Sequence, residues 1–189
     1  LAAAGLLLSA TGACALKPPN IIFILADDLG YGDLGCFHQD TKPAPRFDTP
    51  QIDALAADGI RLTHHYAASP VCAPSRASFL LGRHQGHCSL RANLLYVPLE
   101  DNLTLARMLK QCGYFTAHLG KYGIAGKKAA KTHPGHPNHR GFDYFLGYLF
   151  HGDPNEHYPR NGTTEVGAFV YENDRKIQDA WVDVYTPDL

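Results

Sequence analysis

The segment "NIIFILADDLGYGD" constrains the fold most strongly, because it joins an apolar run to two adjacent acids. Residues 21–26 are an unbroken apolar run, rich in isoleucine, and Asp27 and Asp28 follow at once. Such a run is typical of a strand buried on both faces of a parallel sheet. In an open α/β sheet, ligands bind beyond the carboxyl ends of the strands. The sequence therefore predicts a strand over 21–26, with two carboxylates at a ligand-binding edge.

Residues 49–68 continue the pattern of alternating elements. Thr49 is placed to cap a helix, Pro50 suits its first position and Gly59 suits its end. With apolar residues at helical spacing between them, a short amphipathic helix is predicted. The stretch 60–68 is then predicted to be a strand.

The middle of the chain repeats this alternation. The run "SRASFLLGR" after Pro74 predicts a helix whose N-terminus lies at Cys72, where backbone N–H groups favour an anion. Residues 104–113 predict a second helix, and "YFTAHLGK" predicts a strand that ends at Lys121. The fold class expected is α/β, with a mostly parallel sheet covered by helices on both faces.

The last third of the chain does not continue the alternation of helices and strands. Residues 127–140 are polar and rich in proline, glycine and histidine, which favours a solvated loop over a metal site. Residues 141–162 are aromatic and are predicted to form core turns and a rim over the site. "FVYEN" at 169–173 is predicted to be a strand.

Composition limits the classes of partner. The chain has 189 residues, 45% hydrophobic and 19% charged, with a formal net charge of −1. These values are typical of a globular domain, and they provide no general attraction to nucleic acid or anionic membranes.

The N-terminal residues 1–15 are expected to be the tail of a secretory signal that ends at Ala13-Cys14-Ala15. The apolar run is shorter than the roughly 20 residues that span a bilayer. We therefore expect a secreted or periplasmic protein with no membrane span. Lipid attachment at Cys14 is the alternative. The missing initiator methionine indicates a fragment.

Four of the five cysteines remain once Cys14 is removed with the signal: Cys36, Cys72, Cys88 and Cys112. In an exported protein they could form two disulfides in three ways, and the sequence leaves this pairing open.

Charged residues beside the predicted strand ends suggest anion and metal binding. Asp27 and Asp28 suit a hard cation, Ca²⁺ or, as second choice, Mg²⁺, although a pair of acids also suits a turn or helix cap. Arg76 and Lys121 could hold a tetrahedral oxyanion, and each alone could equally be a surface ion-pair partner.

Five motifs, in this order, resemble the type I sulfatases of the alkaline phosphatase-like superfamily. They are "ADDLGYGDLGC", "TPQIDALAADGI", "CAPSRASFLLGRHQGH", "GYFTAHLGKYGIAG" and "GFDYFLGY". The pattern C-x-P-S-R followed by L-x-G-R is the most specific of them. Residues 16–189 are therefore expected to be the N-terminal part of a sulfatase catalytic domain.

The resemblance implies that Cys72 is a precursor of formylglycine, made by a maturation enzyme. One hydroxyl of the aldehyde hydrate would attack the sulfur of a sulfate ester, and the other would expel sulfate. Asp27, Asp28 and the hydrate at 72 would hold Ca²⁺. Arg76 would stabilise the hydrate, Lys121 would bind the sulfate group, and Arg83 would support the turn.

Two departures from the family pattern affect the site. Gly123 stands where the commoner pattern G-K-W-H has histidine, and we expect His157, with His151 as second choice, to take that catalytic and substrate-binding role. Family members are also much longer than this chain, so further metal ligands are expected beyond Leu189. The chain alone is predicted to be inactive.

The expected function is hydrolysis of a sulfate ester, with sulfated carbohydrate as the expected substrate class. A phosphate or phosphonate monoester hydrolase is the second enzyme hypothesis, because one superfamily serves both chemistries. A non-catalytic fragment that binds sulfated glycans is the third.

Overall fold

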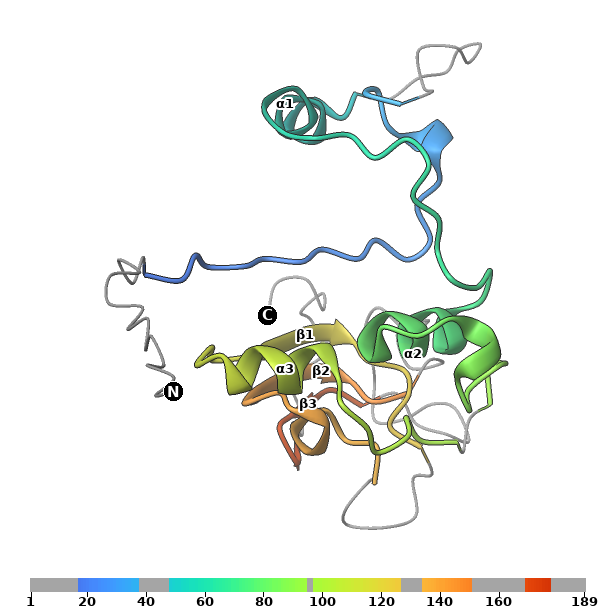
Figure 1. The fold of residues 1–189 in the computed structure, drawn as a ribbon, viewed down its shortest axis with the longest axis vertical. Helices are drawn as coiled ribbons and strands as arrows, with labels where there is room; N and C mark the ends of the chain where they lie inside the picture. The colour runs from blue at the N-terminus through green and yellow to red at the C-terminus, as the bar shows by residue number, and fades with distance from the viewer. Residues whose placement is uncertain (1–16, 38–47, 95–96, 127–133, 151–168, 178–189) are drawn as a thin grey trace, which may run out of the picture. The chain divides into compact units, whose positions relative to one another are not determined.

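The computed structural model describes residues 17–37, 48–94, 97–126, 134–150 and 169–177 (Figure 1). The chain divides into two compact units, Leu1–Ile60 and Arg61–Leu189. Within the described residues, no helix combines the length and apolar character needed to cross a bilayer.

The described residues of the first unit form the helix α1 (Pro50–Asp58) and the 3₁₀ turn η1 (Tyr31–Asp33). The caps of α1 are Thr49 and Gly59, as the sequence predicted. The Thr49 hydroxyl accepts a hydrogen bond from Gly35 N and donates one to Asp53 Oδ1. These bonds fasten the segment after η1 to the first turn of α1. No residue of α1 is buried, so its predicted apolar stripe faces solvent in this unit.

The predicted strand at 21–26 is not formed. The segment has no strand assignment, and Ile22 and Ile24 are 85% and 83% exposed. A strand is stabilised by hydrogen bonds to a neighbouring strand, and this segment has no strand neighbour among the described residues. The predicted strand at 60–68 is also wrong, because that segment consists of turns and irregular backbone.

The second unit is built on a four-stranded sheet in the order β1-β2-β3-β4. Its strands are β1 (Ala117–Lys121), β2 (Tyr144–Tyr148), β3 (Tyr171–Glu172) and β4 (Arg175–Lys176). The first two are parallel, and the other pairs are antiparallel. The α/β class is confirmed, and the described part of the sheet is mixed rather than mostly parallel. β2 replaces the core turns predicted for the aromatic run, whereas β1 and β3 were expected as strands.

Among the described residues, this unit also has the helices α2 (Cys72–Leu81) and α3 (Leu105–Gln111), which contact each other (Figure 1). Thr104 caps α3 by accepting a hydrogen bond from Arg107 N, which confirms the predicted start of that helix. One side of α2 enters the core that the sheet also lines. That core includes Ala73, Ala77, Leu80, Leu81, Tyr122, Ile124, Phe145 and Leu149. The first turn of α2 is therefore fixed relative to the end of β1.

The described loops of this unit include the short 3₁₀ turns η3 (Gln85–His87) and η4 (Pro137–Arg140). The residues of η4 belong to the segment predicted to be a solvated loop. That prediction is wrong for His136, which is 4% exposed and pairs through Nε2 with the Asn173 carbonyl at 2.9 Å. His133 lies outside the described residues.

Candidate active site

Cys72 is the first residue of α2, as the sequence predicted. The helix begins there because Val71 is extended, with φ −123° and ψ 156°, and it ends at Gly82, which adopts the left-handed conformation. Ala73 and Ala77 are buried on the inner side of the helix. This packing leaves the Cys72 side chain at the helix N-terminus, where the helix dipole favours negative charge.

Lys121 lies against Cys72. It is the last residue of β1, and its Nζ is 3.3 Å from Cys72 Sγ. The two residues are 49 positions apart in the sequence, and they meet because the C-terminal end of β1 faces the first turn of α2. An ammonium group at this distance would stabilise negative charge on the group carried by residue 72. The structure therefore places Lys121 beside Cys72, and the roles assigned to both residues stay predictions.

Arg76 joins the same cluster from the next turn of α2. Its side chain is buried, at 8% exposure, and its Nη1 donates a hydrogen bond to the backbone carbonyl of Lys121. A charged donor on a buried carbonyl is among the stronger protein hydrogen bonds. Arg76 therefore fastens the end of β1 to α2, and its side chain is buried rather than on the surface.

The N–H groups of the first turn of α2 are used differently from the sequence prediction. Ala73 N donates to Asn93 Oδ1 at 2.9 Å, Ser75 N donates to Val71 O at 3.3 Å, and Pro74 has no N–H. These groups are therefore not available to a bound anion. Sequence reasoning missed Asn93, because nothing in the sequence links a loop asparagine to a helix 20 positions earlier.

His118 lies beside this cluster on β1. Its ring contacts those of Tyr122, Phe142 and Phe145, with centroid distances of 5.4, 5.3 and 5.8 Å. Burial, and then the positive charge of Arg76, lower the pKa of His118 from 6.5 to about 4, and a hydrogen bond with the Lys121 backbone opposes this. The imidazole is therefore neutral at neutral pH. Sequence reasoning also missed this residue.

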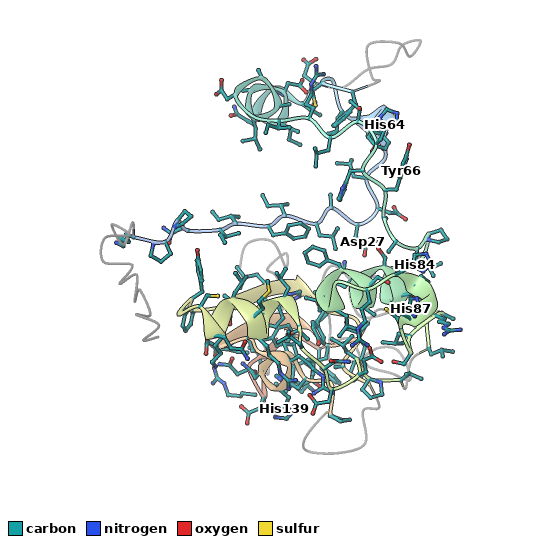
Figure 2. The ribbon with its side chains drawn as sticks, viewed as in Figure 1. Asp27, His64, Tyr66, His84, His87 and His139 are labelled. Carbon is teal, nitrogen blue, oxygen red and sulfur yellow. The ribbon has the colours of Figure 1, made fainter. Side chains whose placement is uncertain are left out.

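The two predicted metal ligands of the first unit are Asp27 and Asp28. Both are exposed, and Figure 2 labels Asp27. Adjacent carboxylates supply the oxygen ligands that Ca²⁺ and Mg²⁺ prefer, so the donor chemistry fits such an ion. Across the described part of the chain, no cluster of three or more histidine, cysteine, aspartate or glutamate side chains is present. A complete ligand set therefore requires donors from elsewhere.

The turn after α2 carries Gly82 and Arg83, the last two residues of the L-x-G-R pattern. Arg83 N donates to Ser78 O, and Arg83 Nη1 forms a 3.1 Å ion pair with Glu100. Both contacts are those of a residue that supports the turn. His84 and His87 follow in the same turn (Figure 2), with ring centroids 6.4 Å apart.

The remaining predictions concern cysteines and distant histidines. Cys36, Cys72, Cys88 and Cys112 are all free, so none of the possible disulfides among them is formed. His151 and His157 lie outside the described residues. Gly123 is buried and has a φ of 78°, a backbone conformation that favours glycine.

Comparison with known proteins identifies the family. A family model described as Sulfatase matches residues 19–186. The chain belongs to the sulfatase family. This sulfatase chain is 45% identical over 143 residues to arylsulfatase D of Homo sapiens, a match that covers 70% of the chain and 23% of the relative. It is 35% identical over 185 residues to arylsulfatase J of Mus musculus, covering 94% and 29%.

Solved structures agree with this assignment. The sulfatase chain superposes on Ps i-CgsB in complex with k-i-k-neocarrahexaose with a TM-score of 0.71, at 30% identity, over 91% of this chain and 39% of that one. The resemblance drawn from the motifs and the alkaline phosphatase-like fold are both confirmed. The chain spans roughly a quarter of the length of the curated relatives it matches.

Proposed function

We propose that the full-length protein is a sulfuric ester hydrolase in which residue 72 carries the nucleophile. The contact of Lys121 Nζ with Cys72 Sγ at a helix N-terminus is the observation that carries this proposal. This contact places the nucleophile of residue 72 within hydrogen-bond distance of the Lys121 ammonium group. A sulfate ester has an electrophilic sulfur that the nucleophile could attack and anionic oxygens that the ammonium group could bind. Family membership supports the same reaction class.

The nucleophile we propose is not the thiol. Cys72, Pro74, Ser75 and Arg76 form the C-x-P-S-R pattern, so we propose that a maturation enzyme converts Cys72 to formylglycine. The hydrate of that aldehyde would supply the hydroxyl that attacks sulfur. A thiol would give a thiosulfate ester with no second hydroxyl for its breakdown, which is the chemical reason for preferring the hydrate.

The chain's own residues would then have separate roles. Lys121 would bind the sulfate oxygens and offset negative charge at residue 72. Arg76, through the Lys121 carbonyl, would hold β1 against α2 and keep its own positive charge beside the nucleophile. Asp27 and Asp28 would hold Ca²⁺, which would supply positive charge for the sulfate oxygens. We retain His157, with His151 as second choice, as the proposed replacement for the histidine absent at Gly123.

The proposed substrate class is sulfated carbohydrate. The structural neighbour Ps i-CgsB was solved in complex with k-i-k-neocarrahexaose, which is a carbohydrate. We also keep the proposal that the protein is exported, in which case a polymeric sulfated glycan would be accessible to it. Export is tested by sequencing the N-terminus of the secreted or periplasmic protein.

The test uses the full-length protein produced with a formylglycine-generating enzyme. Mass spectrometry of the peptide that contains residue 72 should show the aldehyde, and the protein should hydrolyse an aryl sulfate in preference to an aryl phosphate. Cys72→Ala and Lys121→Met should each abolish or strongly reduce turnover. Lys110→Met is the matched control. Lys110 lies on α3 and pairs with Asp143, so it should not be needed for turnover.

Three results would contradict the proposal. They are a Cys72 that stays a thiol in active protein, a preference for the phosphate ester, and equal activity in the Lys121 and Lys110 variants. A panel of sulfated oligosaccharides then tests the substrate class, and the absence of hydrolysis across such a panel would remove carbohydrate from the proposal.

A further inference from the structure

We infer that His118 is a positioning residue of the site, which holds the Lys121 peptide by a hydrogen bond and so sets the position of the Lys121 ammonium group. The inference rests on the proposed function, because it assigns His118 a part in presenting Lys121 to residue 72. His118 and Lys121 belong to the same strand, β1.

The first step is the shared contact with Lys121. Arg76 Nη1 donates to the Lys121 carbonyl, and the His118 ring forms a hydrogen bond with the backbone of Lys121. That bond raises the pKa of the imidazole, so the imidazole is the donor. Two side chains from different elements therefore fix one peptide group. The side chain of that same residue reaches Cys72 Sγ at 3.3 Å.

The second step concerns which ring nitrogen makes the bond. His118 Nε2 is enclosed and has no hydrogen-bond partner among the described residues. Nδ1 must therefore be the donor, and it carries the proton of the neutral ring. An enclosed nitrogen without a partner costs free energy, and a phenylalanine would fill the same aromatic pocket without that cost. The bond from Nδ1 explains why an imidazole occupies the position.

The third step is the local backbone. Gly120 lies between His118 and Lys121 with a φ of 91°, a conformation that few side chains adopt. Gly120 is also part of β1, paired with Gly147, so this unusual backbone conformation lies within the strand that carries both His118 and Lys121. The contacts of that ring with Tyr122, Phe142 and Phe145 hold it in one orientation. A fixed ring and a hydrogen bond together restrict the carboxyl end of β1.

Two substitutions separate positioning from packing. His118→Phe keeps an aromatic ring in the pocket and removes the donor, whereas His118→Asn shortens the side chain and keeps an N–H near the place of Nδ1. In the full-length, converted protein, we expect H118F to lower kcat toward an aryl sulfate about tenfold. We expect H118N to retain most of kcat, even though it loses ring contacts and unfolds at a lower denaturant concentration.

His136→Phe is the matched control. The His136 ring also packs on Phe145, with a centroid distance of 5.6 Å, and it also pairs with a backbone carbonyl, that of Asn173. That carbonyl is not part of the site. H136F should therefore lower stability and leave kcat within about twofold of wild type.

A second measurement does not depend on sulfatase activity. In unconverted full-length protein, the rate at which iodoacetamide alkylates Cys72, followed by peptide mass spectrometry, reports on the Lys121 ammonium group beside the sulfur. H118F should slow this reaction, and H118N and H136F should not.

The outcomes are distinguishable. The proposed function is refuted if wild-type protein carries formylglycine at position 72 but does not hydrolyse sulfate esters. The alkylation rates of the unconverted protein then decide whether His118 positions Lys121. The inference is overturned if H118F keeps both the wild-type kcat and the wild-type alkylation rate. It is also overturned if H118N lowers kcat and the alkylation rate as much as H118F does, because His118 would then only fill the aromatic pocket.

Discussion

The Gly120–Gly147 pair predicts a sharp difference between two alanine substitutions. The two glycines are partners in the parallel register of β1 and β2, one position before Lys121. A Cβ added at Gly147 would lie 2.0 Å from the Gly120 carbonyl oxygen and 2.6 Å from its carbon, and a backbone carbonyl cannot move aside as a side chain can. A Cβ added at Gly120 would meet nothing within 4 Å.

The expected magnitudes follow from this geometry. Both glycines have positive φ, 91° at Gly120 and 152° at Gly147, so either alanine carries backbone strain of about 1–3 kcal/mol. Gly147→Ala adds a clash that forces the two strands apart, and overpacking of this kind costs about 1–3 kcal/mol or more. We therefore expect G120A to lose about 1–3 kcal/mol of unfolding free energy, and G147A to lose about twice as much.

Urea denaturation of the full-length variants, followed by circular dichroism, measures the difference. The same separation of strands would displace the end of β1, so G147A should also lose more turnover than G120A. The reasoning is refuted if G147A is no less stable than G120A, because the register that places Lys121 against Cys72 would then be different from the one described here.

Two further predictions concern polar side chains of the core, the partly buried His118 and the buried Tyr122. The pKa of His118 is depressed by burial from 6.5 to about 4, so the unfolded chain binds the extra proton first. The unfolding free energy should therefore fall by about 3 kcal/mol in total as the pH is lowered from above 6.5 to below about 4. This contribution should be absent from His118→Phe. Urea titration of both proteins across this pH range measures the difference. The Tyr122 hydroxyl is buried without a hydrogen-bond partner among the described residues. Tyr122→Phe should consequently leave the unfolding free energy unchanged or raise it by about 1 kcal/mol, and a loss above that size would show that the hydroxyl makes a stabilising bond.

Local sequence patterns predicted the elements that hold the chemistry. The cap at Thr104, the stop at Gly59 and the helix that starts at Cys72 all depend on residues within one or two turns of one another. Arg76 lies one helical turn after Cys72 for the same reason. The spacing of the C-x-P-S-R pattern therefore placed these side chains together before any tertiary structure was known, and the family assignment followed from the same residues.

Long-range contacts decided the rest. The aromatic run at 144–148 is a strand because β1 and β3 pair with it, and the apolar run at 21–26 is not a strand because no strand among the described residues pairs with it. Both runs have strand-like composition, so composition alone could not separate them. Hydrogen bonds of a strand belong to two segments, and a single sequence carries no record of which segments meet.

The site shows the same division. The sequence by itself determined which residue types surround position 72 and that Cys72 begins a helix. Only the tertiary structure decided that Lys121 Nζ reaches Cys72 Sγ, that Asn93 takes the Ala73 N–H, and that His118 lies against the Lys121 peptide. These contacts join residues on different elements or residues whose strand carries an unusual backbone conformation at Gly120, and a single sequence does not specify either.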